Sequence, residues 1–305
     1  MEQRPEFFEL NIVKTIAADI LNETEQLGEM PVLTIEAGRS EKHYWADLWR
    51  YRELFYFLAW RDLLVRYKQT VVGVAWSLIR PILSVVMLTV IFGIVGKMPS
   101  GGVPYALLVF CGMLPWQFFS TALSESGNSL VTNSNLISKV YFPRLIVPAS
   151  SVVTSFVDFL VSAAFLVVLL VWYQFMPPLN IVFLPLFILL AFAASLGAGI
   201  WIAALMVEYR DFRIIVPFVV QFGVLATPVA YLSSNISKNL GDNWRMLYSL
   251  NPMVGVIDGF RWAILGGEHK IFWPGLLLSI LVTAILLLSG IWYFRRTEKS
   301  FADVI

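Results

Sequence analysis

The sequence predicts an all-α integral membrane protein with six transmembrane helices, on the basis of three observations. Of its 305 residues, 58% are hydrophobic and only 14% are charged, whereas soluble domains carry about a quarter charged residues. Several apolar stretches reach the length of about 20 residues that a helix needs to cross the hydrocarbon of a bilayer. The basic residues gather in alternate connections between these stretches, as in chains that cross a membrane repeatedly.

The composition divides the chain into three parts. Residues 1–43 are polar and acidic and are expected to form a cytoplasmic N-terminal extension. Residues 44–76 are expected to form helices at the membrane surface, and residues 77–305 a transmembrane domain. The six expected spans of that domain are residues 77–96, 104–123, 145–172, 180–207, 214–232 and 271–293.

The distribution of Lys and Arg predicts that both termini are cytoplasmic. Nine of these residues precede residue 71, and two each lie in the connections 124–144 and 208–213. The connections 97–103 and 173–179 hold one and none, respectively. Because short cytoplasmic loops carry the excess of Lys and Arg, the first group is expected inside and the second outside.

The connection 233–270 departs from this alternation, with four Lys or Arg on the expected outer side. Long loops follow the charge rule only weakly. The apolar piece Pro252–Leu265 is too short to cross and suits a re-entrant or interfacial helix. Irregular backbone at membrane depth is tolerated only where it is buried in protein or lines a watery cavity, so we expect a lumen here.

The stretch from Tyr44 to Lys68 is dense in aromatic residues and Arg and contains no Pro or Gly. These features predict an amphipathic helix in the membrane interface, where Trp and Tyr are enriched. If this helix is unbroken, Arg50, Arg61 and Lys68 share one face, because spacings of eleven and seven residues are close to whole turns.

The sequence lacks the common motifs of ATP hydrolysis and hydrolytic catalysis. It contains no G-x-x-x-x-G-K-[ST] phosphate loop, no H-E-x-x-H and no G-x-S-x-G. A single cysteine and two histidines leave no disulfide pair and no zinc ligand set. We therefore expect no enzyme activity, no cofactor and no metal in this chain, and energy for active transport must come from another subunit.

A basic cluster lies where the polar N-terminal part gives way to the first apolar span. It consists of Arg61, Arg66, Lys68 and Arg80. Such a cluster can simply anchor the cytoplasmic end of a first span. Alternatively it binds phosphate or pyrophosphate, because the guanidinium fork of Arg matches two phosphate oxygens.

Three polar features of the spans and connections are also informative. Asp158, near the middle of the third span, suits either proton coupling or pairing with a neighbouring helix, or it is protonated. Residues 208–211 carry opposite charges, which suit either a salt-bridged turn or contact with a soluble partner. The 124–144 connection, stopped by Pro143, is expected to form a short helix on the cytoplasmic face.

Aromatic residues make up 15% of the chain, and most of them fit interfacial belts or core packing. A sugar ring, however, stacks its C–H face on an aromatic ring, so aromatic side chains facing a lumen would provide a path for a polysaccharide. The candidates for such a lining are Trp76, Phe92, Trp116, Phe222, Tyr231 and Trp262.

Several stretches within residues 44–305 occur in the order of a known family, among them SKVYFPRLIVP, ALMVEYRDFRIIVPF, LYSLNPMVGVIDGFRWAILG and FRRTEKSFADVI. On these motifs the chain resembles the type-2 ABC transporter permeases that export polysaccharides, in particular the O-antigen (lipopolysaccharide) exporters, with capsule and teichoic acid exporters as relatives. The resemblance implies a homodimer in the bacterial inner membrane that exports undecaprenyl-pyrophosphate-linked polysaccharide. It also implies two copies of a separate ATP-binding subunit, which would hold ATP and magnesium, and no nucleic-acid partner.

The resemblance implies roles for individual segments. An interface helix at Tyr44–Trp60 would precede a gate helix at Arg61–Val72, which meets the lipid-linked pyrophosphate. A coupling helix would lie within Asn128–Arg144, and re-entrant helices would follow the fifth span at about Trp244–Gly266.

These roles select the candidate site residues. The expected pyrophosphate-binding residues are Arg61, Arg66, Lys68 and Arg80. The residues expected to couple to the ATP-binding subunit are Asn135, Lys139, Arg144, Glu208, Arg210 and Asp211.

Two other functional classes stay open. A permease for a small lipid or drug could use the same six-span fold. A membrane-embedded glycosyl or phosphoryl transferase would also handle polyprenyl phosphates, but it would need an acidic catalytic cluster at the membrane surface, which the sequence does not contain.

Overall fold

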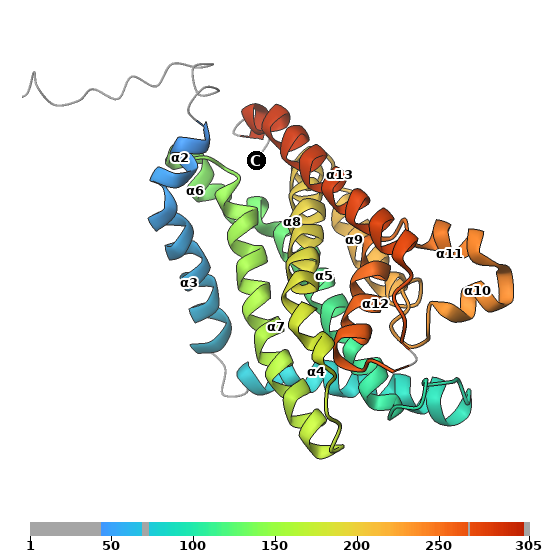
Figure 1. The fold of residues 1–305 in the computed structure, drawn as a ribbon. Coiled ribbons are helices and arrows are strands. Elements are labelled where there is room, and N and C mark those ends of the chain that lie inside the picture. The colour runs from blue at the N-terminus through green and yellow to red at the C-terminus, as the bar shows by residue number, and fades with distance from the viewer. Residues whose placement is uncertain (1–43, 69–72, 268, 302–305) are drawn as a thin grey trace, which may run out of the picture. The chain divides into compact units, whose positions relative to one another are not determined.

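The computed structural model describes residues 44–68, 73–267 and 269–301, and every regular element in these ranges is a helix (Figure 1). The prediction of an all-α fold is confirmed. The expected N-terminal extension, residues 1–43, lies outside the described residues. The elements are, in chain order, α2 (Tyr44–Arg50), α3 (Arg52–Lys68), α4 (Gly73–Leu88), the π-helical turn η2 (Thr89–Val95), α5 (Tyr105–Thr132), α6 (Ser134–Lys139), α7 (Ile146–Trp172), the 3-10 turn η3 (Leu179–Phe183), α8 (Leu184–Glu208), α9 (Phe212–Gly223), α10 (Ser234–Leu240), α11 (Asp242–Tyr248), α12 (Pro252–Ile264), α13 (Trp273–Thr297) and the 3-10 turn η4 (Glu298–Ser300).

Within the described part of the chain, four helices are long and apolar enough to cross a membrane. They are α5, α7, α8 together with η3, and α13, and they coincide with the expected second, third, fourth and sixth spans. The expected first and fifth spans correspond to shorter apolar helices, Pro81–Val95 and Phe212–Gly223. The count of six crossings therefore stays a prediction.

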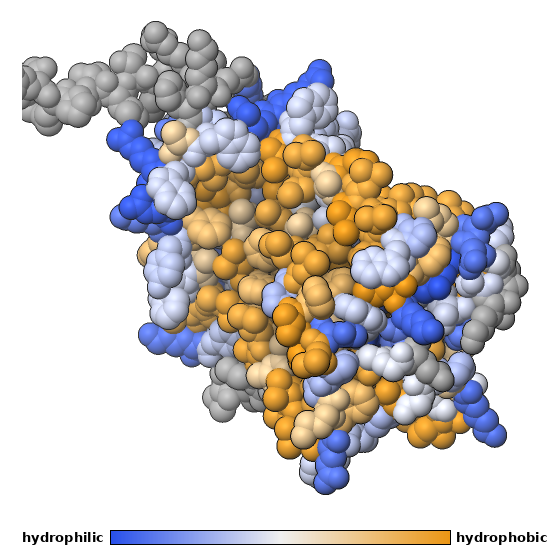
Figure 2. Space-filling model, viewed as in Figure 1, coloured by the Kyte–Doolittle hydropathy of each residue, from blue (hydrophilic) through white to orange (hydrophobic). Residues whose placement is uncertain are grey.

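Helix α5 forms much of the core and packs against α7, α8 and α12 (Figure 1). Its residues 107–116 are all buried. By contrast, α7 and α13 expose large aliphatic side chains such as Val168 and Leu281, and Figure 2 shows a broad apolar surface on the side that it presents. On helices of this length, such a surface is suited to contact with lipid tails.

Two glycines allow α8 and α13 to approach closely. A Cβ atom on Gly197 would lie 2.8 Å from the backbone of Leu287, and one on Gly290 would lie 2.8 Å from the carbonyl oxygen of Gly197. Small residues are typical of such crossings in membranes, because close backbone packing holds the helices together there.

Helix α5 continues to Thr132, past the expected end of the second span at residue 123. The polar side chains of this last part bond back along the helix: Asn128 Nδ2 donates to the Ser124 carbonyl at 2.9 Å, and Thr132 Oγ1 donates to the Asn128 carbonyl at 3.0 Å. Helix α6 follows directly. The predicted short helix in this connection is therefore present, but it occupies less of the connection than the sequence suggested.

The interface helix differs from its prediction in two ways. The expected helix Tyr44–Trp60 is broken at Tyr51, between α2 and α3. Helix α3 then continues past Trp60, where the resemblance placed the boundary between interface helix and gate helix. Furthermore, α3 packs side by side with α7 and buries Leu58 and Ala59 (Figure 1). Burial of this apolar face explains why α3 joins the helical bundle rather than standing alone in the membrane interface.

Helix α12 corresponds to the apolar piece expected to be re-entrant. Nearly all of its residues are buried, and it packs against α5, α8 and α13. Its start is capped by Asn251, whose Oδ1 accepts from the Met253 N–H at 3.0 Å, with Pro252 at the first position of the helix. Burial in protein satisfies the hydrogen-bonding requirement for backbone at this depth, so the burial of α12 does not by itself require a lumen, and the lumen stays a prediction.

Arg261 on α12 is 1% exposed and supports an irregular segment that connects α9 to α10. Its guanidinium donates to the carbonyls of Val229 and Tyr231, each at 2.7 Å, and to that of Leu108 at 3.3 Å. The carbonyls of Val229 and Tyr231 lie outside regular helices, so Arg261 satisfies groups that no helix pairs, whereas Leu108 lies within α5. Arg261 was counted among the charges of the 233–270 connection. It is buried within α12, and the side of the membrane on which this connection lies stays a prediction.

His269, in the connection between α12 and α13, is expected to make stability depend on pH. It is 8% exposed, and burial together with the positive charge of Arg261 lowers its pKa to about 4 from 6.5. The folded protein thus favours the neutral ring, while the unfolded chain begins to bind a proton below pH 6.5. The contribution of His269 to the free energy of unfolding should be fully present above pH 6.5 and should be lost as the pH falls toward 4.

This prediction can be checked by measuring the thermal unfolding midpoint of the detergent-solubilised protein between about pH 4 and about pH 7.5. The His269→Gln variant should show a weaker pH dependence over the same interval. Equal slopes for the two proteins would contradict the assignment.

Candidate functional site

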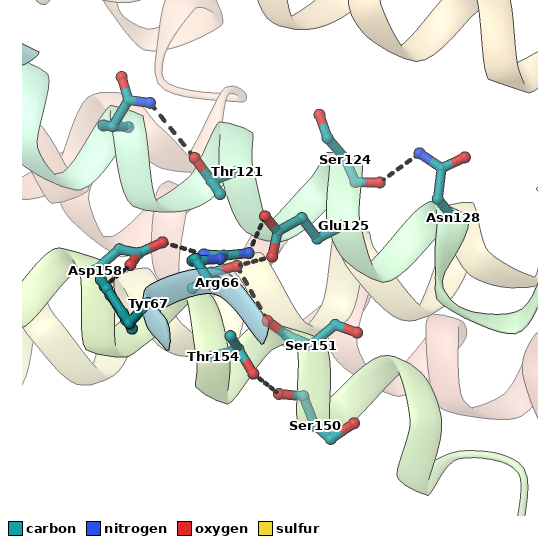
Figure 3. Close-up of polar contacts among 12 residues, drawn as sticks. Arg66, Tyr67, Thr121, Ser124, Glu125, Asn128, Ser150, Ser151, Thr154 and Asp158 are labelled. Carbon is teal, nitrogen blue, oxygen red and sulfur yellow. Dashed lines mark hydrogen bonds and ion pairs between the residues drawn. The ribbon is translucent and has the colours of Figure 1, made fainter. Parts of the chain in front are cut away.

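Arg66, near the end of α3, forms ion pairs with two acidic residues on other helices (Figure 3). Its Nη2 contacts Oε1 of Glu125 on α5, and its Nη1 contacts Oδ2 of Asp158 on α7. The three side chains are between 22% and 34% exposed. Because charges partly withdrawn from water attract each other more strongly than exposed ones, these pairs join α3 to α5 and α7.

Two hydroxyl groups complete the arrangement. Tyr67 OH donates to Oδ1 of Asp158, and Ser155 Oγ donates to Oε2 of Glu125 at 3.2 Å. Each carboxylate therefore accepts a hydrogen bond at both of its oxygens. We call Arg66, Tyr67, Glu125, Ser155 and Asp158 the Arg66 cluster. The prediction that Asp158 is paired with a neighbouring helix is confirmed.

Arg61 lies on the same helix as Arg66 and connects α3 to the start of α6. Its Nη2 donates to Oδ1 of Asn133 at 2.8 Å, and the same guanidinium is paired with Asp62 at 2.7 Å. Asn133 is the single residue between α5 and α6. A movement of α6 can therefore reach α3 through this side-chain contact.

The other two residues of the predicted phosphate site lie further along the chain. Lys68 is exposed at the end of α3. Arg80 belongs to α4, and its side chain lies outside the described part of the structure. The structure thus places Arg61, Arg66 and Lys68 on one helix, with Arg66 directed at carboxylates.

The residues predicted to couple to an ATP-binding subunit lie in two places. Asn135 and Lys139 are exposed on α6. Arg144 follows α6 and donates from Nη1 to the carbonyl of Glu298, just after α13. The connection that holds α6 is therefore attached to the C-terminal end of the last long helix.

Glu208, Arg210 and Asp211 are exposed around the turn between α8 and α9. Among the described residues, none of the ion pairs involves these three, so the structure does not show the salt-bridged turn that the sequence allowed. Instead, Tyr293 OH of α13 donates to Glu208 Oε2 at 2.6 Å. The negative charge of Glu208 also raises the pKa of the exposed Tyr209.

Three of the aromatic residues predicted to line a lumen pack against the subunit's own core. Trp116 is buried beside Phe119, with 5.7 Å between ring centroids. Phe92 and Trp262 are partly buried against the same core. These rings offer little surface to a polymer in this conformation.

The remaining aromatic candidates differ in exposure. Phe222 on α9 is 60% exposed and its ring lies parallel to that of Phe218. Tyr231 is half-buried, and its hydroxyl group shares a hydrogen bond of 2.7 Å with that of Tyr248. The Trp76 side chain lies outside the described residues. Among the five candidates whose side chains the structure describes, Phe222 therefore has the most surface available to a polymer.

Glu125, Tyr67 and Ser155 were not among the residues predicted from the sequence. One signal could have found Glu125: an acidic residue in a helix that continues an apolar span requires a partner, and the nearest basic cluster contains Arg66. Tyr67 and Ser155 carry no comparable signal, since tyrosine and serine are common on such helices.

A comparison with protein families decides the class of this protein. Residues 53–265, more than two thirds of the chain, match the family described as ABC-2 type transporter. The chain belongs to this family. It is therefore a permease subunit and a multi-pass membrane protein, and permeases of this kind work with an ATP-binding partner subunit.

The permease matches known relatives along nearly the whole length of those relatives. The O-antigen export system permease protein RfbA of Myxococcus xanthus is 29% identical over 262 residues, which are 85% of this chain and 98% of the relative. Two proteins of the same name from Klebsiella pneumoniae are 27% and 26% identical, each over 80% of this chain and 92% of the relative. The resemblance inferred from the sequence motifs is thereby confirmed.

Proposed function

We propose that this ABC-2 permease is the membrane-spanning subunit of an O-antigen exporter. It moves undecaprenyl-pyrophosphate-linked polysaccharide across the bacterial inner membrane, with both termini in the cytoplasm. The observation that carries the proposal is the similarity to permeases named for O-antigen export along nearly the whole of their length.

The functional unit in this proposal consists of two copies of the permease and two copies of an ATP-binding subunit. ATP and magnesium are bound by the partner, because the permease sequence contains no phosphate loop. The partner docks on exposed α6 and on the exposed turn after α8. The permease itself catalyses no reaction.

The proposed transport step begins at α3. The pyrophosphate head group is captured by charge-assisted hydrogen bonds from Arg61, Arg66 and Lys68, with Arg80 on the following helix. Closure of the ATP-binding subunits then moves α6, and the contact between Arg61 and Asn133 carries that movement to α3. The polymer follows its head group to the outer leaflet, past exposed aromatic side chains such as Phe222.

Replacing Arg61 and Lys68 together by Ala is expected to abolish export while the complex still assembles. The two substitutions remove two cationic groups from the proposed head-group site but leave the Arg66 cluster intact. Surface polysaccharide should be measured in a strain that depends on this permease, and co-purification of the ATP-binding subunit should be measured in parallel. Arg52→Ala, an exposed charge removed from the same helix, is the matched control and should export normally.

Normal surface polysaccharide in the Arg61→Ala/Lys68→Ala variant would rule out the phosphate role of these residues. Substrates of related classes give different results in a reconstituted complex with its ATP-binding subunit. Stimulation of the ATPase activity by lipid-linked O-antigen supports the proposal. Stimulation by capsular polysaccharide or teichoic acid precursors instead would identify an exporter of those polymers. Stimulation only by a small lipid or drug would identify a permease for small amphiphiles.

A further inference from the structure

We propose that the Arg66 cluster is a latch that opens by anion exchange: Glu125 and Asp158 hold the Arg66 guanidinium until the diphosphate of the substrate takes their place. This inference rests on the proposed function and deepens it, because it assigns a regulatory role to two acidic residues outside the predicted phosphate site. Its chemistry is an exchange of hydrogen-bond acceptors, and no covalent bond changes.

The geometry of Arg66 makes its present partners competitors of a diphosphate. One terminal nitrogen is paired with Glu125 and the other with Asp158. A diphosphate also presents two anionic groups that accept from a guanidinium fork. The two carboxylates and the two phosphoryl groups therefore compete for the same donors on one side chain.

The charges of the cluster explain why a latched permease would not bind the head group. One guanidinium faces two carboxylates, so the ionised cluster has a surplus of one negative charge. This surplus repels an approaching anion, and it does so in surroundings where the side chains are only 22% to 34% exposed and water screens it incompletely. Arg66 becomes a phosphate ligand only after it leaves both carboxylates.

The contacts around the cluster show what the latch holds in place. Arg66 and Tyr67 tie the end of α3 to α7, and Arg66 also ties it to α5. Nearer the start of α3, Arg61 contacts Asn133 at the junction between α5 and α6. Release of the latch frees the end of α3 and alters the restraint on α6, which is the proposed docking helix. Binding of the diphosphate at Arg66 thus changes the docking helix that the ATP-binding subunit contacts.

The first test removes the negative charges and keeps the shape. In the complete complex with its ATP-binding subunit, Glu125→Gln/Asp158→Asn should raise ATPase activity without substrate by about fivefold, the change that a loss of roughly one hydrogen bond's free energy produces. The same variant should need less undecaprenyl pyrophosphate for half-maximal stimulation. Ser155→Ala removes one hydrogen bond from Glu125 and should shift both quantities in the same direction by less, which keeps the test informative if the double variant folds poorly.

The second test follows α3 directly by thiol labelling. Cys111 is buried and is the only cysteine in the chain, so a Cys111→Ser background allows single cysteines to be placed. Ala59→Cys, at a position 6% exposed on the packed side of α3, should react slowly with a maleimide in the detergent-solubilised complex. Undecaprenyl pyrophosphate should accelerate this reaction. In the Glu125→Gln/Asp158→Asn variant the reaction should already be fast without the lipid. Phe57→Cys, at a position 59% exposed, is the matched control and should react at one rate throughout.

The outcomes separate the latch from the proposed function. Slow Ala59→Cys labelling and unchanged ATPase activity in the double variant would overturn the latch, even if undecaprenyl pyrophosphate stimulates the native complex. Fast labelling in the double variant combined with no response of the native complex to undecaprenyl pyrophosphate would overturn the assignment of the substrate instead. Acceleration by inorganic pyrophosphate as well as by the lipid supports recognition of the free diphosphate, and acceleration by the lipid alone supports recognition of the membrane-bound form.

Discussion

Replacing Arg261 by Met is expected to destabilise the folded permease severely. The guanidinium donates to three carbonyls, of which Val229 and Tyr231 belong to the irregular segment between α9 and α10. Methionine fills a similar volume but donates no hydrogen bond. The Leu108 carbonyl lies within α5, but the Val229 and Tyr231 carbonyls would each lose a partner at about 1–3 kcal/mol. That loss is a large share of the stability of about 5–15 kcal/mol that native proteins have.

The measurement is the yield of monodisperse protein in detergent and its thermal unfolding midpoint. Arg261→Lys keeps the charge but cannot reach three carbonyls, so it should be destabilised strongly though less than Arg261→Met. Lys270→Met, which removes an exposed charge close by in the sequence, should behave as the unchanged protein does. A midpoint for Arg261→Met equal to that of the native chain would show that other groups satisfy these carbonyls.

Arg261 also illustrates where prediction from the sequence fails. The position of a Lys or Arg along the chain, which is all that the loop-charge rule uses, carries no information on burial. The burial of Arg261 arises from the packing of α12 against α5, which involves residues more than a hundred positions apart. By contrast, the long apolar helices α7 and α13 were located correctly, because their length and composition are properties of the local sequence.

The candidate site shows the same division. The basic residues of α3 were recognised from their spacing and from family motifs, which are local features. The partners of Arg66 lie 59 and 92 positions away; the sequence indicates that Asp158 needs a partner, but not that this partner is Arg66. The end of α5 was missed for a related reason: residues 124–132 are too polar for a span, and their helix is held by side chains that bond back to the backbone and by the pairing of Glu125.

Replacing Arg66 by Met alone is expected to destabilise the permease more than replacing all three charged residues of its cluster. The single change leaves Glu125 and Asp158 near each other, partly buried and without their cation. Breaking one partner of a fully buried ion pair costs about 3–5 kcal/mol, and the partial exposure of these side chains reduces the expected loss to roughly half of that. Thermal unfolding in detergent should therefore show a clearly lower midpoint for Arg66→Met.

The triple variant Arg66→Met/Glu125→Gln/Asp158→Asn separates stability from transport. It removes the uncompensated charges together with the guanidinium, so its unfolding midpoint should recover most of the loss, while export should remain absent because the proposed phosphate ligand is missing. Glu125→Gln/Asp158→Asn is the matched control, since it keeps Arg66 and should still export. A triple variant that folds and exports normally would mean that Arg66 serves only to pair the two carboxylates. Recovery of the fold without recovery of export would instead identify Arg66 as a residue that acts on the substrate, because the packing of α3 against α5 and α7 would then be intact in a protein that cannot move the polymer.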